Sequence, residues 1–412
     1  MALMPNAHDA AADDAARLAA NAVDSLPAGA LAKKLRTADK EGRQLRVKLG
    51  IDPTAPDIHL GHAVVLGKLR EFQDAGHRVV LIVGDYTARV GDPSGRSTLR
   101  PMLSPQEIDA NAATFQEQAL KILDADPERL EVRRNSEWLD MPLIELLRLL
   151  GTTTAAQLLE RDDFAKRWTS NAPISMLELL YPLLQGYDSV AVHADVELGG
   201  TDQKFNLLLG RDIQRAYGEP EQSILTMPIL VGIDGNQKMS KSLGNQIGVT
   251  DAPEEMFGKT MSIPDAALGD YYRLLIDPRS RGGEPAFTGS PDGLSARDAK
   301  RELARRLVAW LHSEQDAAAA QRHFERVFVQ REAPEEIPEA RFQCVDGMVH
   351  IPGLIAQEFA MSRSDARRVI DQGGVSLGER ALPAGSHDLP CDQADGQILK
   401  VGKRRFRRLR AG

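Results

Sequence analysis

Residues 44–85 carry three hydrophobic patterns in immediate succession. The segment "QLRVKLGID" alternates apolar and polar residues as a strand does, "HAVVLGKLREFQDAG" has apolar residues at helical spacing, and "HRVVLIVGD" is a continuous apolar run typical of a buried strand. A strand, a helix and a strand with short connections form a βαβ unit, whose parallel strands bind ligands beyond their carboxyl ends. We expect the polar segments "DPTAPDIHLGH" and "DYTARVGDPSGRSTLR", which follow the two strands, to form a ligand site.

The same alternation returns later in the chain. The segment "ADVELGGTDQKFNLLLGRDIQRAYG" predicts a strand, a Gly-Gly break and a helix, and "SILTMPILVGIDGNQKMSKSLGN" predicts a strand followed by a loop. The predicted fold class is α/β, with a doubly wound, Rossmann-like parallel sheet. The expected parts are a peripheral helix (1–30), the Rossmann-like domain (31–245) with a helical insertion at about 104–190, an α-helical domain (246–330), an acidic linker (331–345) and a small α+β domain (346–412).

Composition restricts the class of protein. Hydrophobic residues make up 42% and charged residues 27% of the 412 residues, which is typical of a globular protein in water. No run of about 18 apolar residues is present, so we expect no membrane partner. Cys344 and Cys391 are too few and too far apart in sequence for a disulfide framework or a zinc cluster, which favours a reducing, cytoplasmic location.

The net charge of −8 is unevenly spread along the chain. The last residues, "LKVGKRRFRRLRAG", contain seven basic side chains and no acidic one. Basic runs are weak motifs, so charge alone allows either a solvated tail or a nucleic-acid contact.

Two short motifs carry the chemistry. His59 and His62 in "HLGH" lie three residues apart where a helix begins, which suits a metal pair, core packing or the binding of an anion. With no third or fourth ligand nearby, the metal pair is the weakest of these interpretations. Lys238 and Lys241 in "KMSKS" lie on a loop, where two ammonium groups can close on a polyphosphate. Alone, this pentapeptide is equally well an exposed basic loop.

Taken together, "HLGH" and "KMSKS" resemble the two signature sequences of the class I aminoacyl-tRNA synthetases. The order of "GIDPTAPDIHLGH", "GDPSGRS", "YPLLQGYDS" and "GGTDQKFN" is similar to that of the bacterial tyrosyl-tRNA synthetases, and only residues 1–30 are left uncovered. The resemblance implies an enzyme that activates L-tyrosine with ATP and transfers it to tRNA(Tyr), with Mg²⁺ carried by the ATP and no metal bound by the protein. It also implies a homodimer, formed through the leucine-rich insertion "MPLIELLRLLGTTTAAQLLERDDF".

The resemblance assigns roles to individual residues. It gives catalysis to His59, His62, Lys238, Lys241 and Ser242. It gives ATP binding to Gly50, Asp52, Thr54, Gly61, Arg96, Arg100, Gly200, Asp202 and Lys241. It gives tyrosine binding to Gln203, to Asp92, Tyr181 and Gln185 near the substrate ammonium, and to Asp188 as acceptor of the phenol hydroxyl.

Structural alternatives exist for several of these positions. The tyrosine-binding helix carries its polar residues at i, i+4 and i+7, and bonds to neighbouring helices satisfy such a stripe equally well. Asp92 precedes a proline, as turn residues often do, and Asp202 is also suited to capping a helix. Arg96 and Arg100 are expected to meet pyrophosphate, or else to be solvated loop residues.

One position departs from the family pattern. Many tyrosyl enzymes place a second phenol-binding tyrosine two residues before the glycine of "GIDPT", whereas this chain has Lys48. The role of that tyrosine cannot be carried over, so the partner of the second phenol hydrogen bond is left open.

The C-terminal domain resembles a small RNA-binding domain that is shared with a ribosomal small-subunit protein. The segment "SRSDARRVIDQGGVSLGER" predicts a basic helix, a Gly-Gly turn and a strand. Basic residues at helical spacing can face a phosphate backbone together. We therefore assign tRNA binding to Arg363, Arg367, Arg368, Lys403, Arg404 and Arg405.

Two rival functions remain open. A tryptophanyl-tRNA synthetase shares the fold and both signatures, although Asp188 favours a phenol. A catalytically silent RNA-binding relative would keep the fold, although the unbroken "HLGH" and "KMSKS" speak against it.

Overall fold

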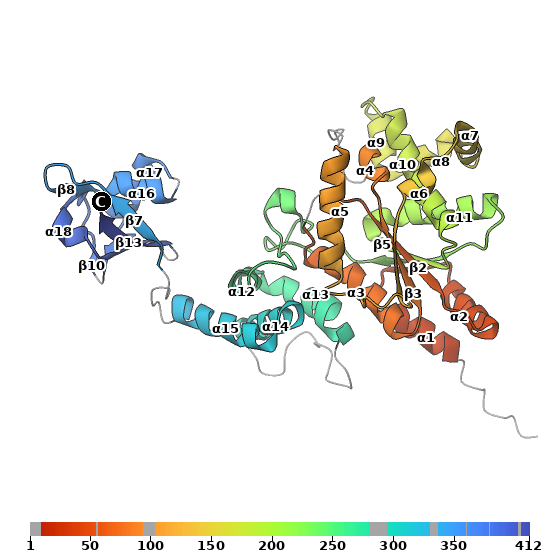
Figure 1. Cartoon of the computed structure of the whole chain (residues 1–412), viewed down its shortest axis with the longest axis horizontal. Coiled ribbons are helices and arrows are strands. Elements are labelled where there is room, and N and C mark those ends of the chain that lie inside the picture. The colour runs from red at the N-terminus through yellow and green to blue at the C-terminus, as the bar shows by residue number, and fades with distance from the viewer. Residues whose placement is uncertain are drawn as a thin grey trace, which may run out of the picture. The chain divides into compact units, whose positions relative to one another are not determined.

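The structure is a computed structural model that describes residues 10–54, 57–93, 104–279, 295–329, 337–359, 361–378, 380–402 and 405–412. The chain divides into two compact units, Met1–Ala318 and Ala319–Gly412 (Figure 1). Each unit has its own hydrophobic core and is described by itself.

The first unit is built on a six-stranded sheet. Its strands are β1 (Asp24–Leu26), β2 (Arg46–Ile51), β3 (Arg78–Val83), β4 (Leu130–Arg134), β5 (Val196–Gly200) and β6 (Ser223–Met227). Their order is β1-β6-β5-β2-β3-β4, and β1 alone runs antiparallel to its neighbour. The strand order reverses between β2 and β5, and a doubly wound sheet binds its ligand at such a switch point. The predicted α/β class and parallel sheet are confirmed.

This unit contains the helices that cover both faces of the sheet and the helices that follow its last strand, β6. They are α1 (Ala10–Leu18), α2 (Ala30–Glu41), α3 (Leu60–Asp74), α4 (Thr87–Val90), α5 (Pro105–Ala119), α6 (Ser136–Leu139), α7 (Leu143–Leu150), α8 (Ala155–Leu159), α9 (Asp162–Thr169), α10 (Met176–Ala191), α11 (Lys204–Ala216), α12 (Pro253–Ser262), α13 (Leu268–Tyr271) and α14 (Ala296–Leu311), and α15 (Glu314–Phe324) crosses into the second unit. Helix α3 lies on one face of the sheet, and α10 and α11 pack together on the other, as Figure 1 shows.

Local sequence explains where these elements lie. Strand β3 buries five of its six residues, because a central parallel strand is covered on both faces. Helix α5 begins with a capping box of Ser104 and Glu107, and α10 begins with one of Ser175 and Glu178. The close approach of α10 and α11 depends on Gly186, because a Cβ there would lie 2.5 Å from Ile213.

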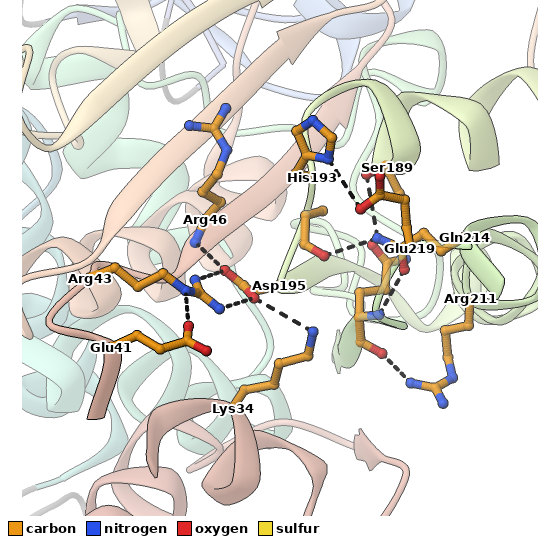
Figure 2. A network of polar contacts seen from close by, with 12 residues as sticks. Lys34, Glu41, Arg43, Arg46, Ser189, His193, Asp195, Arg211, Gln214 and Glu219 are labelled. Carbon is orange, nitrogen blue, oxygen red and sulfur yellow. Dashed lines mark hydrogen bonds and ion pairs between the residues drawn. The ribbon is translucent and has the colours of Figure 1, made fainter. Parts of the chain in front are cut away.

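Asp195 joins the N-terminal helices to the amino ends of the strands (Figure 2). Its carboxylate accepts bonds from the guanidinium of Arg43 (2.7 Å) and the backbone N–H of Arg46 (3.0 Å), and Lys34 lies 3.5 Å away. Burial alone would raise the pKa of Asp195, but the bonds from Arg43 and Arg46 and the charge of Lys34 hold it below its ordinary value. This network lies at the amino ends of β2 and β5, opposite the carboxyl ends where a doubly wound sheet binds its ligand.

The structure differs from the sequence prediction at two strands of this unit. Strand β1 lies inside the segment predicted to be a peripheral helix, and β4 lies inside the predicted helical insertion. Both are edge strands of the sheet, and neither is covered as fully as β3. Their apolar patterns are therefore too short or too weak to stand out in the sequence.

The second unit is a small α+β domain. Its strands are β7 (Glu339–Phe342), β8 (Met348–His350), β9 (Val375–Leu377), β10 (Arg380–Ala381), β11 (Asp388–Pro390), β12 (Ile398–Val401) and β13 (Arg405–Ala411), and its helices include α16 (Ile351–Phe359), α17 (Arg363–Asp371) and α18 (Cys391–Ala394). Five strands form one sheet in the order β10-β9-β12-β13-β7, while β11 pairs with β8. Strand β7 falls within the segment that the sequence predicted to be a linker.

The basic C-terminal run is not a solvated tail where the structure describes it. Its residues form β12 and β13, and Leu399, Val401 and Leu409 point into the core of the unit. Phe406, the aromatic residue of this run, is buried, and the ammonium of Lys400 lies 5.4 Å from its ring centre. The alternation of apolar and basic residues is that of strands with one buried face.

Cys344 and Cys391 form a disulfide, which contradicts the prediction made from their spacing. The two Cα atoms lie 6.2 Å apart although 47 residues separate the cysteines in sequence. The antiparallel pairing of β11 with β8 returns the chain to the neighbourhood of Cys344 just before Cys391. Sequence distance was therefore a poor measure of distance in space.

Candidate active site

The two histidines of "HLGH" cap helix α3. The Nδ1 atom of His59 accepts the backbone N–H of Gly61 (3.2 Å), and Nδ1 of His62 accepts the backbone N–H of His59 (3.3 Å). The ring centres lie 4.0 Å apart. Because both Nδ1 atoms act as acceptors, the proton of each neutral ring lies on Nε2.

Burial keeps both rings uncharged near neutral pH. It lowers the pKa of His59 to about 2, and His62 and Lys238 add to the effect. It lowers the pKa of His62 to about 4, and Lys238 again contributes. The pair thus offers neutral N–H donors beside a helix N-terminus, an arrangement that suits an anion.

Gly61 is required by this cap. A Cβ at Gly61 would lie 3.0 Å from the ring of His59 and 3.7 Å from the Cβ of Met239. A side chain would therefore push the ring out of its bonding position. The sequence assigned Gly61 to the approach of a nucleotide, and the ring of His59 supplies a second reason for glycine.

The "KMSKS" segment lies against the start of α3. Just beyond it, the backbone N–H of Val249 donates to Ile58 O (2.9 Å), and that of Leu60 donates to Ile247 O (2.9 Å). Met239 is buried and faces Gly61. The structure therefore brings the two motifs together, as the sequence predicted for a shared site.

Both lysines of the motif are ion-paired. The ammonium of Lys238 lies 2.5 Å from the carboxylate of Asp202, and Lys241 pairs with Asp57. Both lysines are about half exposed, so an anionic ligand can compete for their ammonium groups. Ser242 is also exposed, and its hydroxyl lies 2.8 Å from that of another serine of the motif.

The polar residues of α10 meet the ends of the neighbouring elements. The hydroxyl of Tyr181 donates to Asp52 Oδ2 (2.9 Å), beyond the end of β2. The indole N–H of Trp138 in α6 donates to Asp188 Oδ1 (2.8 Å). These bonds satisfy the buried groups and leave the carboxylates at the carboxyl side of the sheet, where the sequence expected a ligand.

A chain of amide and carboxylate bonds links Gln185 to Asp92. Asn206 donates to Gln185 Oε1 (2.9 Å) and to Gln203 Oε1 (3.0 Å), and Gln203 donates to Asp92 Oδ2 (2.8 Å). The guanidinium of Arg161 lies 3.6 Å from Asp92. Asp92 therefore has long-range partners in addition to its place before a proline.

Several acidic groups of this cluster have displaced pKa values. Burial raises the pKa of Asp52 to about 7, and the charges of Asp92 and Asp188 add to the rise. Burial raises the pKa of Asp188 to about 6, against the lowering effect of Lys48. The pKa of Tyr181 is also raised by burial. A bound cation would relieve the repulsion among these carboxylates.

The remaining predicted residues of this unit lie beside groups already described. A Cβ at Gly50 would lie 4.0 Å from Asp188 Oδ2, and one at Gly200 would lie 2.5 Å from Asp202 Oδ1. Thr54 follows β2, and its backbone N–H donates to Asp52 O (2.7 Å). Asp202 does not cap α11, so the helix-cap alternative was wrong.

Sequence reasoning missed several partners of these groups. Asp57, Trp138 and Asn206 received no role, although each bonds to a predicted residue. Asp57 was detectable, because it stands two residues before His59 at the start of the same helix. Asn206 was also within reach of the sequence, because it ends the segment "GGTDQKFN". Trp138 lies far from any motif in sequence, so only the fold brings it into the site.

The predicted cations outside the two motifs divide into two groups. Arg363, Arg367 and Arg368 are exposed on α17, and Arg405 is exposed at the start of β13. The other four predicted cations, Arg96, Arg100, Lys403 and Arg404, lie outside the described residues.

The described ranges hold neither a metal-ligand cluster nor a membrane-spanning helix. No group of three or more His, Cys, Asp or Glu side chains in those ranges is placed to hold a metal ion. In the same part of the chain, no helix has both the length and the apolar character needed to span a membrane.

Comparison with known sequences identifies close relatives. A sequence model of the family described as tRNA synthetases class I (W and Y) matches residues 40–329. The tyrosine–tRNA ligase of Moorella thermoacetica is 50% identical over 388 residues, which are 93% of this chain and 92% of that protein. The tyrosine–tRNA ligase of Thermotoga maritima is 49% identical over 397 residues, which are 95% of this chain and 96% of that protein.

Solved structures with a similar fold belong to the same class. The tyrosyl-tRNA synthetase of Archaeoglobus fulgidus, determined with L-tyrosine, matches 76% of this chain and 99% of its own with a TM-score of 0.61 and 25% identity. A C-terminally truncated mitochondrial tyrosyl-tRNA synthetase of Aspergillus nidulans matches 77% of this chain and 94% of its own with a TM-score of 0.63. At 22% identity the second comparison speaks for the fold alone.

Proposed function

The chain belongs to the class I tRNA synthetases of the tryptophan and tyrosine type, and from this membership we propose that it is a tyrosine–tRNA ligase. It would activate L-tyrosine with ATP and transfer the tyrosyl group to tRNA(Tyr). The observation that carries the choice of amino acid is Asp188, whose carboxylate lies beside Gly50 and is oriented by Trp138. An anionic acceptor there suits the hydroxyl of a phenol, and tyrosyl-tRNA synthetases are themselves the standard example of a site that rejects phenylalanine for want of that hydroxyl.

The other end of the cluster suits the ammonium of the amino acid. Asp52, which the resemblance assigned to ATP, and Asp92 are carboxylates that repel one another, and a bound ammonium would stabilise both in their charged form. Tyr181 already donates to Asp52, and Gln203 already donates to Asp92, so both acceptors are held in place. Gln185 belongs to the same bonded chain through Asn206 and lies between the two ends of the site.

The crevice beside α3 suits the phosphates of ATP. His59 and His62 would donate from Nε2, while Lys238 and Lys241 would exchange their carboxylate partners for phosphate oxygens. Mg²⁺ would arrive with the ATP as part of the substrate. We assign the nucleotide side of the site to Gly50, Thr54, Gly61, Gly200 and Asp202. Ser242 is exposed, and we assign it to the closing of the "KMSKS" loop. We assign Arg96 and Arg100 to the binding of pyrophosphate.

The reaction then needs position and charge more than acid–base groups. A carboxylate oxygen of tyrosine attacks the α-phosphorus of ATP, the bond to the bridging oxygen breaks, and pyrophosphate leaves. In the second step a hydroxyl of the terminal ribose of tRNA attacks the carbonyl carbon of the adenylate, and AMP leaves. The lysines and histidines stabilise the negative charge that develops on pyrophosphate.

The second unit would bind the tRNA. Arg363, Arg367 and Arg368 project from one helix, and their exposure leaves them accessible to a phosphate backbone. Arg405 is exposed on the adjoining sheet, and Lys403 and Arg404 precede it in sequence. We further propose that residues 246–330 form the helical anticodon-side domain of the enzyme.

We also propose a homodimer that works in the cytoplasm, where ATP and tRNA are available. Helix α7, in the predicted interface segment, exposes Leu143 (69%), Ile144 (68%) and Leu147 (53%), and a second copy of the chain would bury them. Light scattering at micromolar protein tests the dimer, and a mass near the 45.1 kDa of one chain would refute it.

Substitution of Asp188 tests the proposed choice of amino acid. We expect Asp188→Asn to lower kcat/KM for tyrosine in ATP–pyrophosphate exchange by about 10²-fold or more, because only tyrosine offers a hydroxyl to the carboxylate. Exchange with phenylalanine should change little. Asp195→Asn is the matched control, because Asp195 is buried at the amino end of β5, away from the carboxyl ends of the strands. Equal losses for both amino acids in Asp188→Asn would refute the assignment.

A further inference from the structure

Lys48 replaces a residue that the family pattern would use to bind the phenol, and it lies in the interior of the sheet. It is fully buried, and its ammonium lies 2.8 Å from Glu197 Oε1. The two residues are direct neighbours on the adjacent parallel strands β2 and β5. A buried charge pair of this kind is stable only when further bonds satisfy both groups.

The ammonium of Lys48 is fully bonded to groups of the protein. It donates to the carbonyl of Gln185 (2.9 Å), to the hydroxyl of Ser189 (2.8 Å) and to Glu197. Ser189 in turn donates to Glu197 Oε2 (3.2 Å), and Gln222 donates to the same oxygen. All three protons of the ammonium are used, so Lys48 cannot itself take the place of the missing phenol donor.

Helix α11 also holds the part of this network that belongs to α10. Figure 2 shows Ser189 beside Gln214, whose side-chain amide donates to the carbonyls of Ser189 (3.4 Å) and Ala194 (2.9 Å). A Cβ at Gly210 would lie 3.5 Å from the hydroxyl of Ser189 and 3.4 Å from Glu197 Oε2. The network is therefore packed closely against α11, and the ammonium has a defined position.

Alternate residues of strand β2 and its extension contact successive positions of helix α10 at this site. Lys48, Gly50 and Asp52 alternate onto one face of the strand and its extension. Lys48 meets the turn of α10 that contains Asp188, Gly50 faces Asp188 itself, and Asp52 meets Tyr181. Lys48 therefore lies two residues before Gly50 on the same face of the strand. Gly50 faces Asp188, the proposed acceptor of the substrate hydroxyl.

Charges of both signs act on Asp188 from the elements around it. Burial raises its pKa, Lys48 on β2 lowers it, the neutral donors Trp138 and Asn135 lower it, and Glu197 on β5 raises it by a smaller amount than Lys48 lowers it. The carboxylate of Asp52, at the end of β2, interacts with Asp188 as well. Arg133 lies outside this group, with its guanidinium 5.3 Å from the ring centre of Trp138.

We propose that Lys48 and Glu197 form a positioning pair for hydroxyl selection, in which the ammonium keeps Asp188 ionised and Glu197 holds that ammonium behind α10. The proposal rests on the proposed tyrosine–tRNA ligase activity and gives the origin of its preference for a hydroxyl. Lys48 touches neither the substrate nor the reacting atoms and acts through Asp188. The neutral donors Trp138 and Asn135 then share the carboxylate with the substrate.

Two substitutions of opposite electrostatic sign test the pair. Lys48→Met removes the cation, so the apparent pKa that limits kcat/KM for tyrosine on its acidic side should rise by about one unit. The ratio of kcat/KM for tyrosine over phenylalanine should then fall by about twofold at pH 7 and by nearly tenfold at pH 5.5, because the ionised fraction of Asp188 falls by these factors. Glu197→Gln removes the anion, so the same apparent pKa should fall. ATP–pyrophosphate exchange with each amino acid between pH 5.5 and 8.5 gives both quantities.

The controls separate an electrostatic role from a structural one. Lys68→Met removes another buried lysine, paired with Glu71 at 2.7 Å on α3, and should leave the ratio and the pH profile as in the wild type. The double variant Lys48→Met/Glu197→Gln leaves no unpaired buried charge and folds even if a single variant does not. It should still raise the apparent pKa, because Lys48 acts on Asp188 more strongly than Glu197 does.

The outcomes distinguish this inference from the proposed function. If the wild type shows no tyrosine-dependent exchange, the ligase assignment itself fails. If the wild type prefers tyrosine but the folded double variant keeps its ratio and its pH profile, the positioning role of the pair is overturned. Shifts of the same sign in Lys48→Met and Glu197→Gln would also overturn it, because a general loss of structure does not depend on the sign of the charge removed.

Discussion

The ammonium of Lys238 lies 2.5 Å from the carboxylate of Asp202, and both groups belong to segments assigned to ATP. Lys241, the second lysine of the same motif, is paired in the same way with Asp57. Both lysines of the motif are therefore paired with acidic side chains of the protein itself. Binding of ATP must replace these partners, and the effects of substitution at Lys241 and Asp57 depend on this competition.

Replacement of Lys241 by alanine should slow adenylate formation. We expect a loss of about 10²-fold to 10³-fold in the single-turnover rate, because one donor to the developing charge is removed. The dissociation constant for tyrosine should stay nearly constant, since Lys241 pairs with Asp57 and not with the tyrosine cluster. Lys259→Ala is the matched control, because Lys259 is ion-paired with Asp251 outside both motifs. A near-normal adenylation rate in Lys241→Ala would remove the lysine from the mechanism.

Replacement of Asp57 by asparagine should have the opposite effect on ATP. The ion pair between Asp57 and Lys241 is partly exposed, so it stabilises the chain by only about 0.2–1 kcal/mol. The substitution breaks this pair and frees the ammonium of Lys241. The KM for ATP in pyrophosphate exchange should therefore fall, by up to about fivefold. The KM for tyrosine is the internal reference and should not move. A rise in the KM for ATP would mean that Asp57 helps ATP to bind.

The hydrophobic pattern of the sequence was sufficient to predict the central strands of the sheet but not its edge strands. Strands β2 and β3 and helix α3 were predicted because each carries one clear hydrophobic period over its length. Strand β4 was missed because "LEVRR" buries one of its five residues fully and reads as part of a polar region. The basic run at the C-terminus was predicted as a cationic surface, although its apolar residues form two strands of the core.

The candidate site was predictable only where a motif marked it. "HLGH" and "KMSKS" are recognisable from the sequence alone, and the structure places them side by side. The bond from Tyr181 to Asp52 joins residues 129 positions apart, and the bond from Trp138 to Asp188 joins residues 50 apart. No local period encodes such pairs, because they are products of the strand order and the helix packing. The role of Lys48 was left open for the same reason.

The buried histidines predict a particular dependence of stability on pH. The pKa of His62 lies at about 4 in the folded chain, below the ordinary value of 6.5, so the unfolded state binds more protons between these values. His62 therefore contributes stability above pH 6.5 that is lost as the pH falls toward about 4. On acidification from pH 7.5 to pH 5, the melting temperature of the wild type should fall further than that of His62→Asn.

His193→Asn is the control for this measurement. The side chain of His193 is 68% exposed, so its removal should leave the acid sensitivity of the wild type in place. Equal falls in melting temperature for the wild type and His62→Asn would contradict the burial of an uncharged His62.

The exposed arginines of α17 should affect tRNA and not the adenylate. We expect a triple alanine variant of Arg363, Arg367 and Arg368 to raise the KM for tRNA in aminoacylation. The slope of log affinity against log salt should become shallower by roughly 0.7 to 0.9 for each phosphate contact that is lost. Pyrophosphate exchange without tRNA should be unchanged and serves as the control. An unchanged salt slope would show that this helix face does not contact the tRNA backbone.

The most direct test of the ligase assignment is ATP–pyrophosphate exchange by the wild type with each of the twenty amino acids in turn. The carboxylate of Asp188, oriented by Trp138, predicts that tyrosine gives the highest kcat/KM, with phenylalanine lower by about 10³-fold or more and tryptophan no better than phenylalanine. Exchange that is strongest with tryptophan would contradict the assignment within the family. Exchange with none of the twenty amino acids would contradict the proposal that the chain is an aminoacyl-tRNA ligase.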